Sequence, residues 1–227
     1  MTLTRAAGVI LAKELRTEFR SRQLLGTTAV FVLIVIVLFS FTFNPTSDEA
    51  RRFGPGLLWL AFLFAGSLML QSSFLREQTN DTLAALRLAP IEPFGIIAGK
   101  MAANFLFLLL VEIILLPVFA ALYNVAILPV LGQLLTILIL GTVGLASTGT
   151  VFSAIAAQAR LRELLLPLLL LPVLAPVLIA STEATIDVLR DPGQLSRVWL
   201  TWLAFLACFD VIFLTAAWMV GEYLLEE

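Results

Sequence analysis

Histidine is missing from this sequence altogether, cysteine occurs once, and charged residues make up only 13% of the 227 positions. Without histidine the chain lacks the usual general base, the commonest metal ligand and the usual axial ligand of heme. The single cysteine, Cys208, cannot form a disulfide within the chain, and its apolar surroundings predict a small packing residue. These absences argue against catalytic or metal chemistry on the chain itself, so we expect it not to be an enzyme.

A strong net charge is also lacking, because 14 basic and 16 acidic residues nearly cancel. No electrostatic field therefore points to nucleic acid as a partner. Hydrophobic residues are abundant instead. They make up 60% of the chain, whereas soluble domains are about 45–50% apolar. The mean hydropathy is +1.03. One soluble core could not bury that much apolar surface. The composition predicts an integral membrane protein.

Six stretches are long and apolar enough to cross a bilayer as helices, for which about 20 residues are needed. They are residues 24–43, 54–75, 101–122, 127–157, 164–181 and 199–221. We therefore predict an all-α polytopic membrane protein, with residues 1–227 forming a single transmembrane domain. The segment between the last two spans, residues 182–198, is predicted to be an outer loop, with or without a short helix.

Only Glu112 and Asp210 bring charge into these six spans. A charged side chain that faces lipid costs a few kcal/mol, so both are expected to face the interior or to lie near a boundary. Two roles are open for them. They either do functional work or pair with Ser, Thr or Gln side chains such as that of Gln71.

Residues 1–23 have the pattern of an amphipathic helix. Apolar residues recur at helical spacing on one face and basic residues on another; the apolar set is Leu3, Ala7, Ile10, Leu11, Leu15 and Phe19, and the basic set is Lys13, Arg16 and Arg20. This pattern predicts an elbow helix that lies in the headgroup plane before the first span. The alternative is a simple basic anchor at the cytoplasmic side.

The distribution of basic residues predicts the orientation. With six spans, the loops on the side of the two termini contain ten Lys or Arg residues and the opposite loops contain four. Positive charge favours the cytoplasmic side. Both termini are therefore expected in the cytoplasm.

Small residues and prolines distinguish the fourth and fifth spans. Gly149, Ser153 and Ala157 are four apart and form a stripe that allows close helix approach, either within the bundle or at a subunit interface. The fifth span contains Pro167, Pro172 and Pro176. Prolines free backbone carbonyls that need partners, so we expect a distorted helix inside the protein rather than one facing lipid.

The segment between spans two and three, residues 76–100, is the most informative polar stretch. Asn80 or Asp81 can cap a short helix, whose Leu83 and Leu86 are three apart and which Pro90 ends. Glu92-Pro93 then suits a new helix start, which would run through Lys100 into span three. A short amphipathic helix beside the membrane can dock into a groove on a soluble partner. The alternative is an interfacial loop without a partner.

At this segment the sequence resembles the ABC-2 type permeases, the membrane halves of ABC transporters. The matching residues are Glu77, Asp81-Thr82-Leu83, Leu86, Pro90 and Gly99-Lys100. The family favours glycine where this chain has Asp81. Further segments are similar to one member family, heme exporter protein B of cytochrome c maturation: Pro55-Gly-Leu-Leu-Trp59, the run 165–172 continuing at 176–179, and an elbow with Glu14 and Arg22.

The resemblance implies a permease subunit in the bacterial inner membrane. It implies a separate ATPase subunit, further heme-handling membrane subunits and a second copy of this chain as partners. The complex would use ATP to release a heme-loaded chaperone, so ATP would bind to the partner, heme would be handled by the complex, and no cofactor would bind here directly. The chain has no Gly-Lys-Ser/Thr motif, which agrees with ATP hydrolysis elsewhere.

In this reading the segment from Glu77 to Pro90 contacts the ATPase. Leu83 and Leu86 would fill a groove on that subunit, while Glu77 and Asp81 fix the orientation. Three rival functions remain: an ABC-2 permease that exports a lipid, drug or ion, an intramembrane enzyme, and a non-transporting scaffold. The enzyme lacks support, because no histidine pair, carboxylate cluster or Gly-x-Ser-x-Gly turn occurs in the sequence.

Overall fold

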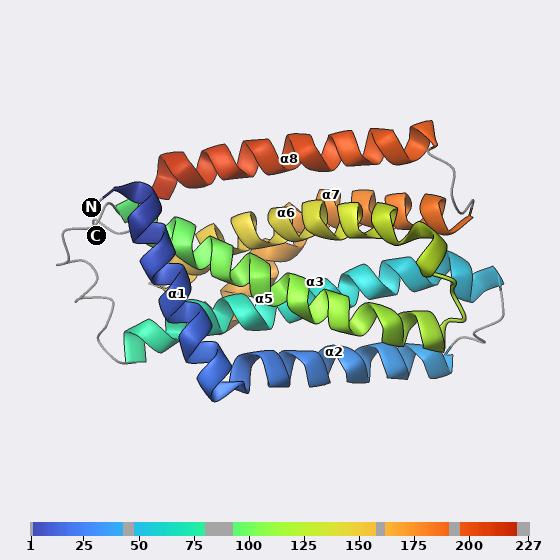
Figure 1. The fold of residues 1–227 in the computed structure, drawn as a ribbon, viewed down its shortest axis with the longest axis horizontal. Coiled ribbons are helices and arrows are strands. Elements are labelled where there is room, and N and C mark those ends of the chain that lie inside the picture. Colours follow the sequence, from blue (N-terminus) through green and yellow to red (C-terminus); the bar gives the residue numbers. More distant parts are fainter. Residues whose placement is uncertain (1, 43–47, 80–92, 158–161, 191–195, 222–227) are drawn as a thin grey trace.

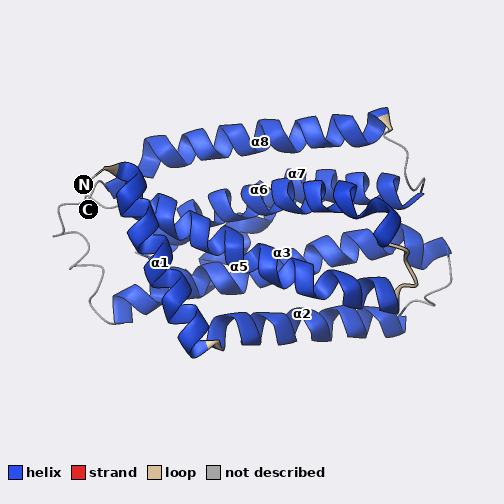
Figure 2. Cartoon of the chain, viewed as in Figure 1, coloured by secondary structure: helices blue, strands red, loops and turns tan. Residues whose placement is uncertain are grey.

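The computed structural model describes residues 2–42, 48–79, 93–157, 162–190 and 196–221. Within these ranges, the side chains of residues 42, 48–51, 74–79, 93, 157 and 162–165 are not described. Every regular element in the described ranges is a helix (Figure 2). The all-α prediction is confirmed.

Six long helices run along a common direction as a bundle (Figure 1). They are α2 (Gln23–Thr42), α3 (Asp48–Thr79), α5 (Pro93–Leu122), α6 (Leu131–Ala157), α7 (Arg162–Arg190) and α8 (Arg197–Gly221), with a 3-10 turn, η1 (Leu128–Val130), before α6. Each contains a segment long and apolar enough to cross a membrane, and the segment of α6 also includes η1. The segments are Gln23–Phe41, Arg52–Ser73, Phe94–Leu122, Leu128–Ala156, Leu166–Arg190 and Arg197–Gly221. The prediction of a six-span membrane protein is confirmed.

The third spanning helix begins where the sequence indicated. Helix α5 starts at Pro93 and runs through Lys100 without a break, because proline at the first helical position needs no backbone donor. Helix α3 likewise continues to Thr79. The polar segment predicted at 76–100 is therefore shorter at both ends than the composition suggested, and its central part, residues 80–92, lies outside the described residues.

Helix α7 differs from the prediction at its outer end. It continues to Arg190 instead of ending at Ser181, so most of the predicted loop 182–198 is helical. Tertiary contacts hold this extension, since Thr185 is buried, donates to the Ser181 carbonyl at 2.6 Å and accepts from the indole of Trp59 at 3.1 Å. Composition alone underestimated the helix because it does not show the tertiary partner of a polar residue such as Thr185.

The prolines of α7 do not interrupt the helix, which is continuous across Pro167, Pro172 and Pro176. Pro167 and Pro176 are half-buried, but Pro172 is exposed on the surface of the chain. The expectation that all three lie away from lipid stays a prediction. Proline is tolerated here because neighbouring helices and local adjustments satisfy the freed backbone groups.

A seventh described helix, α1 (Leu3–Ser21), precedes the bundle and lies across its end (Figure 1). It ends at Arg22, whose φ of 52° is left-handed and turns the chain sharply into α2. Glu18 stabilises the turn, because its carboxylate accepts a hydrogen bond of 2.8 Å from the Leu25 N–H in the first turn of α2. A carboxylate at a helix N-terminus satisfies a free donor and the helix dipole together. The predicted elbow helix is present.

The apolar face of α1 packs on protein rather than on lipid, which corrects the expectation for this face. Ala6 and Ile10 are fully or almost fully buried. They lie over two glycines of α5 that are four residues apart: a Cβ on Gly95 would come within 2.7 Å of the Ala6 Cβ, and a Cβ on Gly99 within 2.7 Å of the Ile10 Cβ. Small residues at this spacing let two helices approach closely. Within the predicted apolar set, only Phe19 is exposed.

Helix α6 is packed against its neighbours through glycine. A Cβ on Gly149 would lie 2.2 Å from the Leu70 side chain in α3, and one on Gly144 would lie 3.2 Å from Val177 in α7. Ser153 donates to the Leu70 carbonyl at 3.0 Å. Of the two roles considered for the small-residue stripe, packing within the bundle is therefore the one that Gly149 and Ser153 have.

We expect Gly99→Ala to detach α1 from the bundle. The new Cβ would meet the Ala7 carbonyl oxygen at 2.7 Å, and backbone cannot yield as a flexible side chain does. Thermal unfolding in detergent should show a loss of about 1–3 kcal/mol, the usual cost of overpacking, and proteolysis should cut α1 faster. Gly8→Ala, on α1 itself with no atom within 4 Å of the new Cβ, is the control. Equal stability of the two variants would contradict the tight α1–α5 contact.

Candidate functional site

The side chain of Lys100 joins three helices at the end of the bundle where α1 lies. It is completely buried. Its ammonium group donates to the Glu14 carboxylate of α1 at 3.1 Å and to the backbone carbonyl of Ser73 in α3 at 2.9 Å. Lys100 itself belongs to α5, so one cation holds α1, α3 and α5 together. We call Lys100, Glu14 and Ser73 the Lys100 junction.

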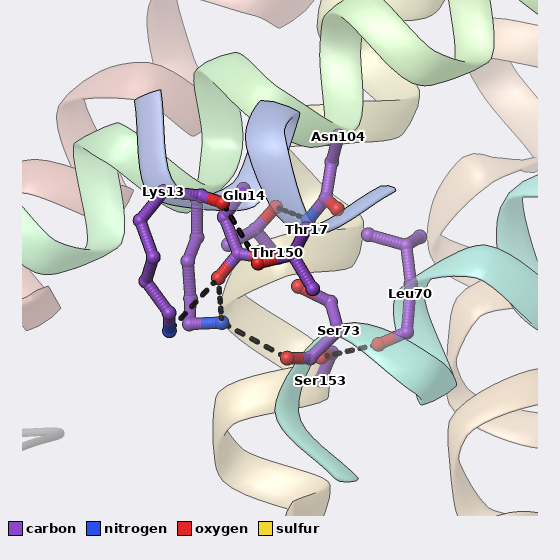
Figure 3. Close-up of polar contacts among 9 residues, drawn as sticks. Lys13, Glu14, Thr17, Leu70, Ser73, Asn104, Thr150 and Ser153 are labelled. Carbon is purple, nitrogen blue, oxygen red and sulfur yellow. Dashed lines mark hydrogen bonds and ion pairs between the residues drawn. The ribbon is translucent and has the colours of Figure 1, made fainter. Parts of the chain in front are cut away.

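Two further hydrogen bonds extend the Lys100 junction to α6 (Figure 3). The Asn104 amide, one turn after Lys100, donates to the Thr150 hydroxyl at 3.0 Å, and Ser153 donates to the Leu70 carbonyl at 3.0 Å. All four of these groups are buried within the protein. Four helices, α1, α3, α5 and α6, are thus connected by polar contacts within one region of the bundle.

Because Lys100 is buried, its contacts contribute strongly to the free energy of unfolding. A buried ammonium is stable only if it is paired and hydrogen-bonded, and removing one partner of such a pair is strongly destabilising. Lys13 gives the contrast: it contacts the same Glu14 oxygen at 3.5 Å, but 42% of its side chain is exposed to solvent. Exposed pairs contribute little to stability. The geometry therefore assigns the structural role to Lys100.

The Lys100 junction lies beside both ends of the segment predicted to contact an ATPase. Ser73 is within about two turns of the end of α3, and Lys100 is within about two turns of the start of α5. The same contacts tie these two helix ends to α1 and α6.

The predicted contact residues themselves remain untested. Glu77 lies in the last turn of α3, but its side chain is not described. The other members of the set lie outside the described residues: Asp81, Thr82, Leu83, Leu86 and Pro90. Their role stays a prediction.

Glu112 and Asp210 both face the interior of the bundle. This agrees with the prediction from the free-energy cost of placing a charged side chain in lipid. Glu112 is 1% exposed and accepts from the Thr142 hydroxyl of α6 at 2.5 Å, while its second oxygen has no partner. Asp210 is 5% exposed, lies against Gly144 of α6, and neither of its oxygens has a partner. The two carboxyls approach α6 from different helices, and no group of three or more potential metal ligands occurs in the described part of the chain.

Sequence reasoning missed the role of Lys100. It placed the residue in the helix that runs into span three and matched Gly99-Lys100 to a family motif, but it gave the lysine side chain no partner. Two signals pointed further: two glutamates, Glu14 and Glu18, in an otherwise basic elbow, and a lysine expected inside a helix. Only the packing of α1 on α5 brings the Glu14 and Lys100 side chains together.

The comparisons with known proteins agree with this architecture. The family model described as CcmB protein matches residues 5–220. Heme exporter protein B of Pseudomonas aeruginosa is 32% identical over 220 residues, covering 94% of this chain and 97% of that protein. Proteins of the same name from Rhodobacter capsulatus and Paracoccus denitrificans are each 32% identical, over 174 and 175 residues; both matches cover 77% of this chain, and they cover 79% and 80% of those proteins.

We expect Lys100→Met to destabilise the chain by about 3 kcal/mol, because it leaves the Glu14 carboxylate and the Ser73 carbonyl without their cation. Adding Glu14→Gln to it should cost little more, since the partner is already lost, so a double-mutant cycle in detergent should show strong coupling. Lys13→Met, which changes the exposed contact to the same carboxylate, should cost less than about 1 kcal/mol. Additive effects of Lys100→Met and Glu14→Gln would refute the Lys100 junction.

Proposed function

Because this chain belongs to the CcmB protein family, we propose that it is the membrane permease subunit of a heme-exporting ABC transporter complex. The match over nearly the whole length of a heme exporter protein B carries this proposal. Six membrane-spanning helices with buried polar residues between them would form the transmembrane part of such a transporter. ATP hydrolysis is assigned to a separate subunit, since the sequence has no phosphate-cradling Gly-Lys-Ser/Thr motif.

The complex is proposed to act in cytochrome c maturation, in the bacterial inner membrane. Its further partners are heme-handling membrane subunits and a second copy of this chain. Gly221, the last residue of α8, is packed against Phe94 at the start of α5, and α1 packs on the same part of α5. Helix α1 and the end of α8 therefore lie at the same end of the bundle. We propose that this end lies in the cytoplasm, which the excess of basic residues in its loops favours.

The proposed mechanism couples ATP turnover to the spans through the segment 80–92. The ATPase would hold this segment by Leu83 and Leu86, with Glu77 and Asp81 setting its orientation. Its movement would load the end of α3 and the start of α5, which the Lys100 junction ties to α1. A buried ion pair resists gradual separation, so these helix ends would move together rather than one at a time. The outcome in the cell would be release of a heme-loaded chaperone.

The decisive experiment is deletion of the gene in its host, followed by heme staining of membrane proteins on denaturing gels. We expect c-type cytochromes to disappear, because their heme is covalently attached by the maturation pathway, and spectra of b-type cytochromes to stay unchanged. The wild-type gene and a Lys13→Met variant should both restore c-type cytochromes. Unchanged c-type cytochromes would reject heme export and favour a permease for a lipid, drug or ion.

We further expect Leu83→Arg with Leu86→Arg to abolish co-purification of the ATPase subunit while the chain still inserts into the membrane. Two charges cannot enter an apolar groove without a large desolvation cost. Leu128→Arg is the matched control, because Leu128 is 81% exposed and lies in η1 at the opposite end of the bundle. Retained co-purification of the double variant would remove this segment from the interface.

A further inference from the structure

The fold sorts the charges of α1 onto opposite sides of the helix. Both of its carboxylates point inward: Glu14 binds Lys100, and Glu18 is fully buried and caps α2. The arginines of the helix, Arg5, Arg16 and Arg20, are all exposed. The outward side of α1 is therefore more basic than its composition suggests.

The exposed residues form one continuous face. Arg5, Val9, Arg16, Phe19 and Arg20 follow one another at helical spacing, so they share a side of the helix. That side is opposite the one on which Ile10, Glu14 and Glu18 turn into the protein. Val9 and Phe19 are 52% and 60% exposed. Basic and large apolar side chains are thus interleaved on a surface that no described part of the chain covers.

Along the bundle, this face lies at one boundary of the apolar stretch of α5. The apolar span of α5 begins at Phe94, and α1 packs on Gly95 and Gly99 in its first two turns. Because α1 crosses the bundle instead of extending it (Figure 1), the whole length of its outer face stays near that boundary. Such a position places cations beside lipid phosphates and apolar side chains beside the first acyl carbons.

We propose that this face of α1, formed by Arg5, Val9, Arg16, Phe19 and Arg20, is a binding site for the headgroups of anionic phospholipids. Guanidinium groups fit phosphate oxygens with paired hydrogen bonds. The exposed Val9 and Phe19 favour a bilayer over a soluble acidic protein, because they would bury their surface at the acyl boundary. Since the Lys100 junction anchors the inner side of α1, a bound headgroup would also hold α3 and α5.

The test uses the full chain in detergent, titrated with phosphatidylglycerol or with phosphatidylcholine, and bound lipids are counted by native mass spectrometry. The variant set is Arg5→Gln, Arg16→Gln and Arg20→Gln together. The matched control removes three exposed arginines at the other end of the bundle, Arg52→Gln, Arg190→Gln and Arg197→Gln. We expect phosphatidylglycerol affinity to fall about tenfold or more in the first set only, since each basic residue near an anionic surface adds to binding.

A charge-keeping set, Arg5→Lys, Arg16→Lys and Arg20→Lys, should retain a preference for phosphatidylglycerol that weakens with added salt. Equal loss in the two glutamine sets, or equal binding of both lipids by the wild type, would overturn the proposal. So would unchanged lipid binding with lost ATPase co-purification in the first glutamine set, because the face would then be a protein contact. If that set does not fold, the salt dependence of the wild type and of the lysine set decides the question. The assay needs neither heme nor ATPase activity, so its result is independent of the proposed function.

Discussion

The fold depends on one constraint: a polar group buried in or beside the hydrocarbon layer must find its partner within the protein. Lys100 shows this most clearly, since its ammonium is completely buried and is held by the Glu14 carboxylate and the Ser73 carbonyl. That single requirement places α1 against α5 and fixes the end of α3. Glycines at 95 and 99 make the approach close enough for the contact to form.

The same constraint explains how α6 can be rich in hydroxyls. The Thr142 hydroxyl lies within hydrogen-bond distance of two acceptors, the Leu138 carbonyl of its own helix and the Glu112 carboxylate of α5, and its one proton serves one of them at a time. Ser153 and Thr150 bond to α3 and α5. The exceptions include unpartnered oxygens of Glu112 and Asp210, and both of these residues lie against α6. An intramembrane carboxyl without a full set of partners is a functional hypothesis in its own right.

Hydropathy located the six spans because a segment that crosses lipid must be made mostly of apolar residues. It failed to locate the end of α7, where hydrogen bonding of polar groups decides how far the helix continues. Helix α7 continues past Ser181 because Thr185 is bonded to Trp59, a residue of α3 that is far away in the sequence. The amphipathic pattern of α1 was seen correctly, but a pattern cannot say whether its apolar face meets lipid or protein, and here Ala6 and Ile10 meet glycines of α5.

The sequence by itself predicted that the chain lies in a membrane, and it predicted the number of spans and the elbow helix before the first of them. It also predicted the start of α5 at Pro93. These features follow from local composition and backbone chemistry. It also carried the family resemblance through residues such as Gly99-Lys100. Only the tertiary structure decided that Lys100 is buried, that Glu14 is its partner and that the arginines of α1 are left facing outward. Those facts depend on distances between segments remote in the chain, which no local pattern encodes.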